Sequence, residues 1–155
     1  MKVLFTDIDG VLNGDGYVRR HGGDGVVIDP TRMPLLQQIV QATGAVIVLS
    51  SSWREHWEPR GGGDAVGRQL DALFAAYGLS IADKTPRLRS GREQEIAAFL
   101  AAHPHVTAFA VLDDWFLESD LLTEHFVLTS RLREGLDATD VQRAITILNG
   151  SEATV

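Results

Sequence analysis

The sequence contains no cysteine, which excludes a disulfide framework and any thiolate chemistry. It also has no apolar run that approaches the ~18 residues needed to span a membrane, so we expect no membrane partner. The first residues form a short strand-like run and lack the charged segment and long apolar stretch of a signal peptide. These absences fit a reducing compartment, and we expect a cytoplasmic protein.

The sequence also lacks an excess of basic residues. It has 14 Lys and Arg against 21 Asp and Glu, which gives a formal net charge of −7. Such a charge disfavours broad electrostatic capture of nucleic acid but leaves a local basic site open. The five histidines show no metal-ligand spacing and receive no role. The arginines cluster in three places: Arg19 and Arg20, then Arg87, Arg89 and Arg92, then Arg131 and Arg133.

The 155 residues and 45% hydrophobic content indicate a single globular domain, residues 1–155. Apolar runs alternate with stretches of helical periodicity, which predicts an α/β fold whose parallel sheet is covered on both faces. Asp29 is the expected N-cap of the first long helix, and Thr139 or Asp140 lies near the cap of the last. The expected strands are 3–5, 45–49, 79–81, 107–112 and 126–128, and the expected helices are 30–43, 64–77, 91 or 92 to 102, and 140–148.

Polar side chains follow three of the predicted strands at the point where each strand ends. Asp7 and Asp9 follow the first, the serines of residues 50–52 follow the second, and Asp113 and Asp114 follow the fourth. Ligands of open parallel sheets bind at the carboxyl ends of the strands. The sequence therefore predicts one site that gathers these side chains.

Four carboxylates at one edge repel one another, and this repulsion raises their pKa values. A magnesium ion relieves the conflict, because it prefers oxygen ligands from one or two carboxylates together with a substrate phosphate. A metal-held phosphate also makes an aspartate an effective nucleophile, and attack by a carboxylate gives an aspartyl-phosphate. The pattern indicates a phosphohydrolase whose chemistry starts at Asp7 and Asp9.

Residues 7–12, Asp-Ile-Asp-Gly-Val-Leu, resemble the first motif of the haloacid dehalogenase-like (HAD) superfamily of phosphatases. Residues 48–51, Arg92 and residues 111–114 resemble its second, third and fourth motifs, in the family's order. Residues 51–54, 92–96 and 135–136 further resemble small HAD domains of proteins linked to RNA repair. The resemblance implies a Rossmann-like three-layer sandwich with a mostly parallel five-stranded sheet in the order 5-4-1-2-3. It also implies that there is no large cap domain.

By this resemblance Asp7 is the nucleophile and a metal ligand. Asp9 protonates the leaving group, then activates water, and binds Mg²⁺ through its backbone carbonyl. A second aspartate two residues on is typical of the family's phosphatases. Asp114 is the expected direct metal ligand, and Asp113 binds the metal directly or through water.

The remaining roles implied by the resemblance concern the phosphate. Ser51 is the expected hydroxyl donor, with Ser50 and Ser52 as alternatives. Arg92 occupies the third-motif position, where a lysine is usual, and Lys84 is the alternative. Arginine suits the role because its guanidinium binds phosphate bidentately.

Two further residues, Arg54 and Asn13, are candidates for contacts with the substrate. The residues between the first and second motifs leave room only for a small flap at 13–29. An open site of this kind admits a bulky phosphorylated substrate such as a nucleotide or a nucleic-acid end, or is closed by another subunit. Oligomeric state is not readable from the sequence. Trp53 and Trp115 are more often packing residues than base-stacking platforms.

Two other functions compete with hydrolysis. A phospho-accepting receiver domain also carries strand-end carboxylates, but its acidic pair comes first in the chain and its acceptor aspartate on a later strand. A binding module could keep the HAD fold without turnover, although each catalytic position here has a competent residue type. The sequence therefore favours the phosphohydrolase.

Overall fold

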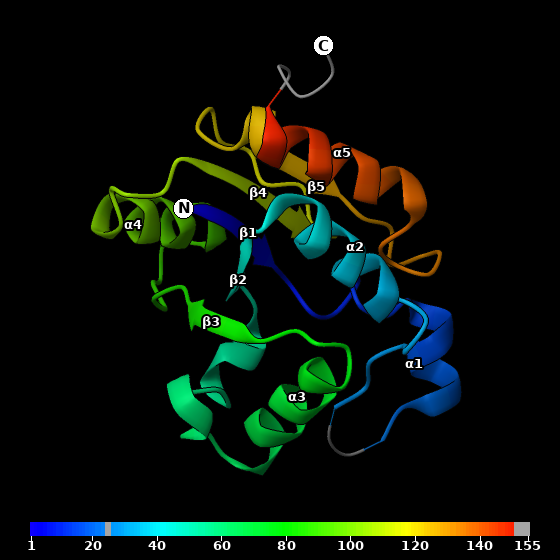
Figure 1. Ribbon diagram of the computed structural model, residues 1–155. Coiled ribbons are helices and arrows are strands. Elements are labelled where there is room, and N and C mark those ends of the chain that lie inside the picture. The colour runs from blue at the N-terminus through cyan, green and yellow to red at the C-terminus, as the bar shows by residue number, and fades with distance from the viewer. Residues whose placement is uncertain (24–25, 151–155) are drawn as a thin grey trace.

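The computed structural model describes residues 1–23 and 26–150 as a five-stranded sheet between layers of helices (Figure 1). The strand order is β3-β2-β1-β4-β5, and each neighbouring pair is parallel. This confirms the predicted α/β sandwich and its order, here counted from the opposite edge. The strands are β1 (Lys2–Thr6), β2 (Val46–Leu49), β3 (Ile81–Lys84), β4 (Ala108–Asp113) and β5 (Phe126–Leu128).

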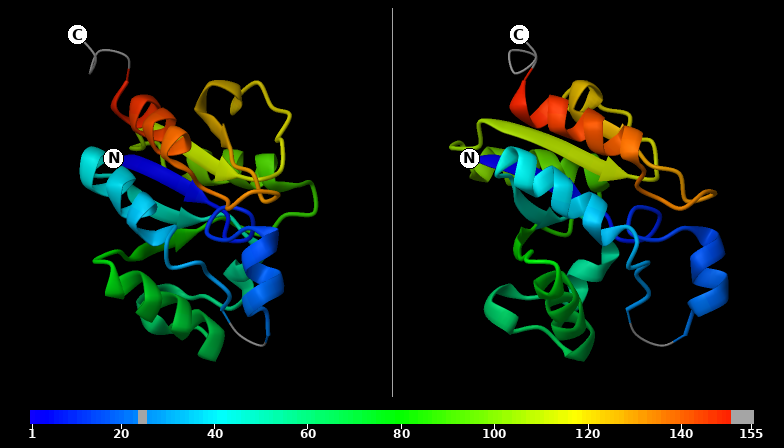
Figure 2. Two further views of the ribbon diagram at one scale, coloured as in Figure 1. Left: turned by 90° about the vertical axis from the view of Figure 1, so that its right-hand side faces the viewer. Right: turned by 45° about the vertical axis from the view of Figure 1, so that its right-hand side comes forward.

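Helices cover both faces of the sheet because successive strand residues point to opposite sides. Leu4 of β1 faces a core built with α2, α3 and α5, whereas Val3 and Phe5 face a core built with α4. Figure 2 shows α4 on the side of the sheet opposite α2 and α5. The helices are α1 (Asp15–His21), α2 (Met33–Thr43), α3 (Ala65–Ala76), α4 (Arg92–Ala102) and α5 (Ala138–Asn149).

Some boundaries differ from the prediction. The strand expected at 79–81 is β3 at Ile81–Lys84, because the backbone N–H of Leu79 donates to the carbonyl of Phe74 and closes the end of α3. Asp29 does not cap α2. Its carboxylate accepts from the backbone N–H of Thr31 and stabilises a turn that precedes the helix, whose N-cap is Arg32.

The last helix also begins earlier than expected. Its N-cap is Asp137, whose carboxylate accepts a hydrogen bond from the backbone N–H of Asp140. The Asp140 carboxylate accepts one from the N–H of Asp137 in return. The two side chains form a capping box, so α5 begins at Ala138 and not at residue 140.

No large cap covers the carboxyl ends of the strands in the part of the chain that the structure describes. The segment predicted as a small flap, 13–29, contains the short helix α1, which has no buried residue and lies beside that end of the sheet (Figures 1 and 2). Residues 24–25 of this segment lie outside the described residues. The edge of the sheet is therefore reachable by a large ligand.

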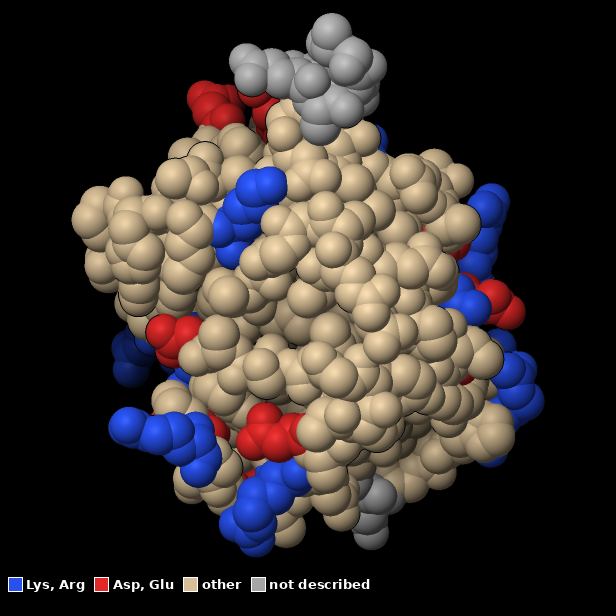
Figure 3. Space-filling view, viewed as in Figure 1, with Lys and Arg blue, Asp and Glu red and all other residues tan. Residues whose placement is uncertain are grey.

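The surface over α2 and α5 is poor in charge, and its Lys, Arg, Asp and Glu side chains lie mainly around the rim (Figure 3). This face offers little electrostatic attraction to an anion. Among the described residues, no helix combines the length and the hydropathy that crossing a bilayer requires.

Candidate active site

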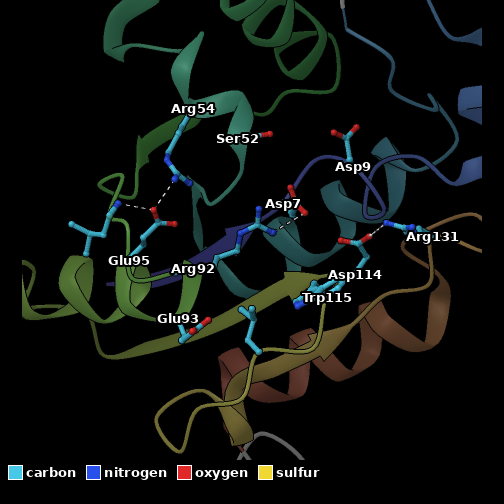
Figure 4. Close-up of a pocket in the computed structure, with 13 residues that line it drawn as sticks. Asp7, Asp9, Ser52, Arg54, Arg92, Glu93, Glu95, Asp114, Trp115 and Arg131 are labelled. Atoms are coloured by element: carbon cyan, nitrogen blue, oxygen red, sulfur yellow. Dashed lines mark hydrogen bonds and ion pairs between the residues drawn. The ribbon is translucent and has the colours of Figure 1, made fainter.

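An open pocket of about 610 Å³ lies at the carboxyl ends of the central strands (Figure 4). Asp7 and Asp9 reach it from the loop after β1, Ser52 and Arg54 from the loop after β2, and Asp114 from the loop after β4. The parallel sheet thus brings together side chains that are far apart in the sequence. The other residues that line it are Leu88, Gly91, Arg92, Glu93, Glu95, Trp115, Leu117 and Arg131.

Asp7 is held at the floor of this pocket and is only 6% exposed. One carboxylate oxygen, Oδ1, accepts a hydrogen bond from the backbone N–H of Ile8 at 2.8 Å. The other, Oδ2, accepts from Nη1 of Arg92 at 3.0 Å. The carboxylate is therefore fixed in orientation while one edge still faces the pocket.

Arg92 is the first residue of α4 and lies between two carboxylates. Its Nη1 atom is 3.0 Å from Asp7 and 2.7 Å from Asp113. The preceding Gly91 has a φ of 123°, a conformation that favours glycine. Lys84, the alternative for this position, instead donates to the backbone carbonyls of Arg54 and Trp57 and to Glu58, outside the pocket.

Three carboxylates form a candidate metal site. Asp7, Asp113 and Asp114 each offer an oxygen, and these atoms lie within 4.8 Å of one another. Oxygen ligands at this spacing suit a hard cation such as Mg²⁺. Asp9 does not belong to this group through its side chain. The residues present therefore fit the metal that the first motif implies.

Gly10 makes room for the third carboxylate. Its φ is 81°, and a Cβ built on it would lie 2.4 Å from Cγ of Asp114. Any side chain would strain the backbone and also displace Asp114. The carbonyl of Gly10 is anchored from the other side by the hydroxyl of Thr129 at 2.7 Å. The glycine of the Asp-Ile-Asp-Gly motif thus lets β1 and β4 loops approach each other.

Burial dominates the electrostatics of the site. It raises the pKa of Asp7 from 3.8 to about 7, opposed mainly by the charge of Arg92 and reinforced by that of Asp113. Burial also raises the pKa of Asp113, although Arg92 opposes it. Burial alone would lower the pKa of Arg92, but the charges of Asp7 and Asp113 have the larger combined effect and raise it. One arginine does not fully balance this site, and a cation among the carboxylates would add the missing positive charge.

The Asp9 carboxylate stands apart from Asp7 and is held by two neutral donors (Figure 4). Nε1 of Trp53 donates to its Oδ2 at 3.0 Å, and Nδ2 of Asn13 donates to its Oδ1 at 3.1 Å. Asn13 is only 2% exposed, and its Oδ1 accepts from the backbone N–H of Gly10. In this arrangement Asn13 orients Asp9 and does not line the pocket.

The three serines after β2 have different environments. Ser52 is exposed and lines the pocket. Ser51 is buried; its hydroxyl oxygen accepts from the backbone N–H of Trp53, and the hydroxyl is one of the groups that lower the pKa of Asp7. Ser50 is also buried, and among the described residues its hydroxyl has no hydrogen-bond partner. Ser51 therefore lies near Asp7 but is 0% exposed, whereas its alternative Ser52 is the serine that lines the pocket.

Arg54 is fixed by a residue that the sequence analysis missed. Its Nη2 donates to Glu95 at 2.7 Å, and its Nη1 donates to the backbone carbonyl of Ser51. Glu95 is only 3% exposed and also accepts from the backbone N–H of Leu88. The spacing of the two residues could have indicated Glu95, because it lies three residues after Arg92 and therefore on the same face of α4.

Trp115 and Arg131 stand at the mouth of the pocket. Trp115 is 69% exposed, so it is not a core residue. Trp53, by contrast, is partly buried and packs against the core. The Arg131 side chain is 57% exposed and lies 3.9 Å from Asp114. A large aromatic ring and a cation thus border the candidate metal site.

Comparison with known protein families assigns the chain to a family. Residues 3–141 match the model of a family described as the HAD domain in Swiss Army Knife RNA repair proteins. No curated protein matches the chain significantly. The matched range covers β1 from Val3 onward, the other four strands, the candidate metal ligands and the start of α5.

Proposed function

The chain belongs to the HAD domains of Swiss Army Knife RNA repair proteins, and on that premise we propose that it is a magnesium-dependent phosphomonoesterase. The observation that carries the proposal is the group of Asp7, Asp113 and Asp114, whose oxygens lie within 4.8 Å of one another beside Arg92. This combination of a nucleophile, metal ligands and a balancing cation is what transfer of a phosphoryl group requires.

Asp7, Asp113 and Asp114 would hold the metal, together with the backbone carbonyl of Asp9. A bound Mg²⁺ offsets the charge of these carboxylates and polarises a phosphoryl oxygen. Arg92 balances the remaining charge of Asp7 and Asp113 through the two contacts described above. In this proposal Ser51, which lies beside Asp7, donates its hydroxyl hydrogen to a phosphoryl oxygen, and Ser52, which lines the pocket, is the alternative.

The proposed reaction has two steps. In the first, a carboxylate oxygen of Asp7 bonds to phosphorus, the bond from phosphorus to the leaving oxygen breaks, and Asp9 gives that oxygen a proton. In the second, Asp9 takes a proton from water. The water oxygen bonds to phosphorus as the bond to Asp7 breaks. Inorganic phosphate leaves and both aspartates return to their initial state.

The substrate we propose is a nucleotide or a phosphorylated end of a nucleic acid. The site has no cap among the described residues and opens to solvent, and the arginines Arg54, Arg92 and Arg131 line it. Because the whole chain has a net charge of −7, attraction of a polyanion must come from these arginines locally. The RNA repair proteins named in the family description are consistent with this substrate class.

Two alternatives remain distinguishable. The receiver-like signalling domain does not fit the family to which the chain belongs. A HAD-fold binding module without turnover would show Mg²⁺ binding but no hydrolysis of any phosphoester in a broad panel.

The test is hydrolysis of a generic phosphomonoester and of 5′- and 3′-phosphorylated oligonucleotides by the purified protein with Mg²⁺. Asp7→Asn should lower kcat by at least about 10³-fold, because it removes the nucleophile. Asp83→Asn is the matched control, since this carboxylate is outside the pocket and its side chain is 43% exposed. Turnover by Asp7→Asn at the rate of the control would exclude the mechanism.

A further inference from the structure

A second hollow of about 420 Å³ adjoins the candidate active site. The two hollows share Asp114, Trp115 and Arg131 as a common wall. A single ligand could therefore occupy the second hollow while its phosphoryl group lies in the first. Its remaining lining residues are Leu128, Thr129, Ser130 and Leu132.

Trp115 is fixed in its backbone but exposed in its side chain. Its backbone N–H donates to Oδ1 of Asp113 at 2.9 Å, which ties it to the metal-binding loop. The residue is nevertheless 69% exposed. An aromatic ring that is anchored beside a reactive site and left open to water offers a flat apolar surface for a ligand.

The neighbouring aromatic residue behaves differently. Phe116 is 66% exposed, but its ring makes an edge-to-face contact with Phe126 of β5 at 6.1 Å between centroids. It lines neither of the two adjoining hollows. Phe116 therefore packs against the sheet edge, whereas Trp115 faces the two hollows.

The rest of the second hollow combines apolar and cationic character. Leu128 and Leu132 are 51% and 83% exposed and extend the apolar surface. The Arg131 side chain lies 3.9 Å from both Asp15 and Asp114, which is long for a charge-assisted hydrogen bond. Its guanidinium is thus weakly engaged by these acids and can contact an anionic or aromatic ligand.

We propose that this second hollow is a nucleobase subsite, in which the base of the substrate stacks on Trp115 between Leu132 and Arg131. The assignment rests on the proposed function, because it takes the phosphoryl group of the same nucleotide to lie at Asp7. A base has an apolar face and polar edges, which matches an exposed indole next to leucines, the Ser130 hydroxyl and an arginine. Stacking tolerates any base, so the subsite selects nucleotides without selecting a sequence.

A small ligand is favoured over a protein partner as the occupant. Because Trp115, Asp114 and Arg131 form the wall that both hollows share, a protein docked over Trp115 would also obstruct the reaction pocket. A base attached to the reacting phosphate leaves the metal ligands accessible. It also covers the exposed indole during the reaction.

The experiment measures binding, so that it does not depend on turnover. In an Asp7→Asn background with Mg²⁺, calorimetry gives Kd values for adenosine 5′-monophosphate, adenosine 3′-monophosphate and ribose 5-phosphate, which lacks a base. The comparison is between Trp115→Ala and Phe116→Ala, two truncations of adjacent aromatic residues that are similarly exposed.

At least one adenosine monophosphate should bind more tightly than ribose 5-phosphate. Trp115→Ala should reduce that preference by about 5- to 100-fold, and Phe116→Ala should leave it within about two-fold. The proposal is overturned if neither adenosine monophosphate is preferred, or if Trp115→Ala weakens all three ligands equally. It is equally overturned if Trp115→Ala leaves the preference unchanged, and conversion of a dimer to a monomer in sedimentation would then assign the indole to an interface.

These outcomes are separate from those of the proposed function. A base preference that depends on Trp115 without hydrolysis of any phosphoester supports the subsite and contradicts the phosphatase. Hydrolysis that depends on Asp7 without a base preference supports the phosphatase and contradicts the subsite.

Discussion

At the scale of single residues, the two aspartates of the first motif have opposite environments although only one residue separates them. Asp7 is buried, and its pKa is raised to about 7. Asp9 is exposed and is held by the side-chain N–H groups of Trp53 and Asn13. The difference suits a nucleophile that meets phosphorus and an acid–base group that exchanges protons with the leaving group and water.

Trp53→Phe tests whether the indole positions Asp9. The change removes the N–H that donates to Oδ2 while keeping an aromatic ring against the core. We expect kcat to fall about 5- to 50-fold with little change in KM, because the acid–base carboxylate loses a donor that orients it.

Trp57→Phe is the matched control. Its indole N–H donates to Asp71 at 2.7 Å, away from the candidate active site, so this variant should lose stability and keep its kcat. Two variants that lose stability alike, with kcat unchanged in both, would indicate a merely structural role for Trp53.

At the scale of elements, α4 supplies two charged side chains to the site from one face. Arg92 contacts Asp7 and Asp113, and Glu95 contacts Arg54 of the loop after β2. The helix thereby connects the loops that follow β1 and β2 with the end of β4. The Arg54–Glu95 pair is nearly buried, with side chains 12% and 4% exposed.

Glu95→Gln should lower the free energy of unfolding by about 2–4 kcal/mol, because it leaves the buried Arg54 guanidinium without its counter-charge. Glu55→Gln breaks the pair between Glu55 and Arg87, whose side chains are 49% and 72% exposed, and should cost under about 1 kcal/mol. Urea denaturation measures both values. Equal losses of unfolding free energy in the two variants would show that the buried pair contributes no more to stability than the exposed pair.

At the scale of the whole molecule, the open carboxyl edge of the sheet gathers more negative charge than Arg92 balances. The raised pKa of Asp7 means that the folded state favours the protonated carboxyl. In the metal-free protein, ionisation of Asp7 therefore reduces stability as the pH rises from about 4, and the penalty is complete above its folded pKa of about 7.

Asp7→Asn should consequently stabilise the metal-free protein, by an amount that is absent near pH 4 and largest above pH 7. The shift of the Asp7 pKa from 3.8 to about 7 sets a ceiling near 4 kcal/mol at about 1.4 kcal/mol per pH unit, and we expect about 1–3 kcal/mol. Thermal unfolding in EDTA at pH 5 and pH 8 measures it. If the stability difference between Asp7→Asn and the wild type does not grow from pH 5 to pH 8, the raised pKa of Asp7 is contradicted.

Magnesium should also stabilise the wild type, by offsetting the charge of the ionised carboxylates. Mg²⁺ binding to the native carboxylates stabilises the fold by mass action, so we expect Tm to rise on titration with MgCl₂. The rise should be smaller in Asp114→Asn, and NaCl of the same ionic strength is the control for screening. An equal rise with both salts would indicate screening alone.

The sequence by itself determined the fold class, and the resemblance of its motifs to the HAD superfamily implied the strand order. Apolar runs such as Val46–Leu49 alternate with helical periods, and this local pattern is set by burial on two faces of a parallel sheet. It also placed Asp7, Asp9 and Asp113 at strand ends, because side chains that follow parallel strands meet at one edge. The motif order then predicted the family that the match over residues 3–141 shows.

Only the tertiary structure decided which side chains meet. Lys84 and Arg92 are both basic residues between the second and fourth motifs, and the sequence left the choice open. Arg92 starts a helix that points at Asp7, whereas Lys84 ends a strand and turns to Glu58. The contacts of Trp53 with Asp9 and of Glu95 with Arg54 join residues 44 and 41 positions apart. No local pattern encodes such pairs, because packing of distant elements sets their distance. For the same reason, the exposure of Trp115 emerged only from the fold.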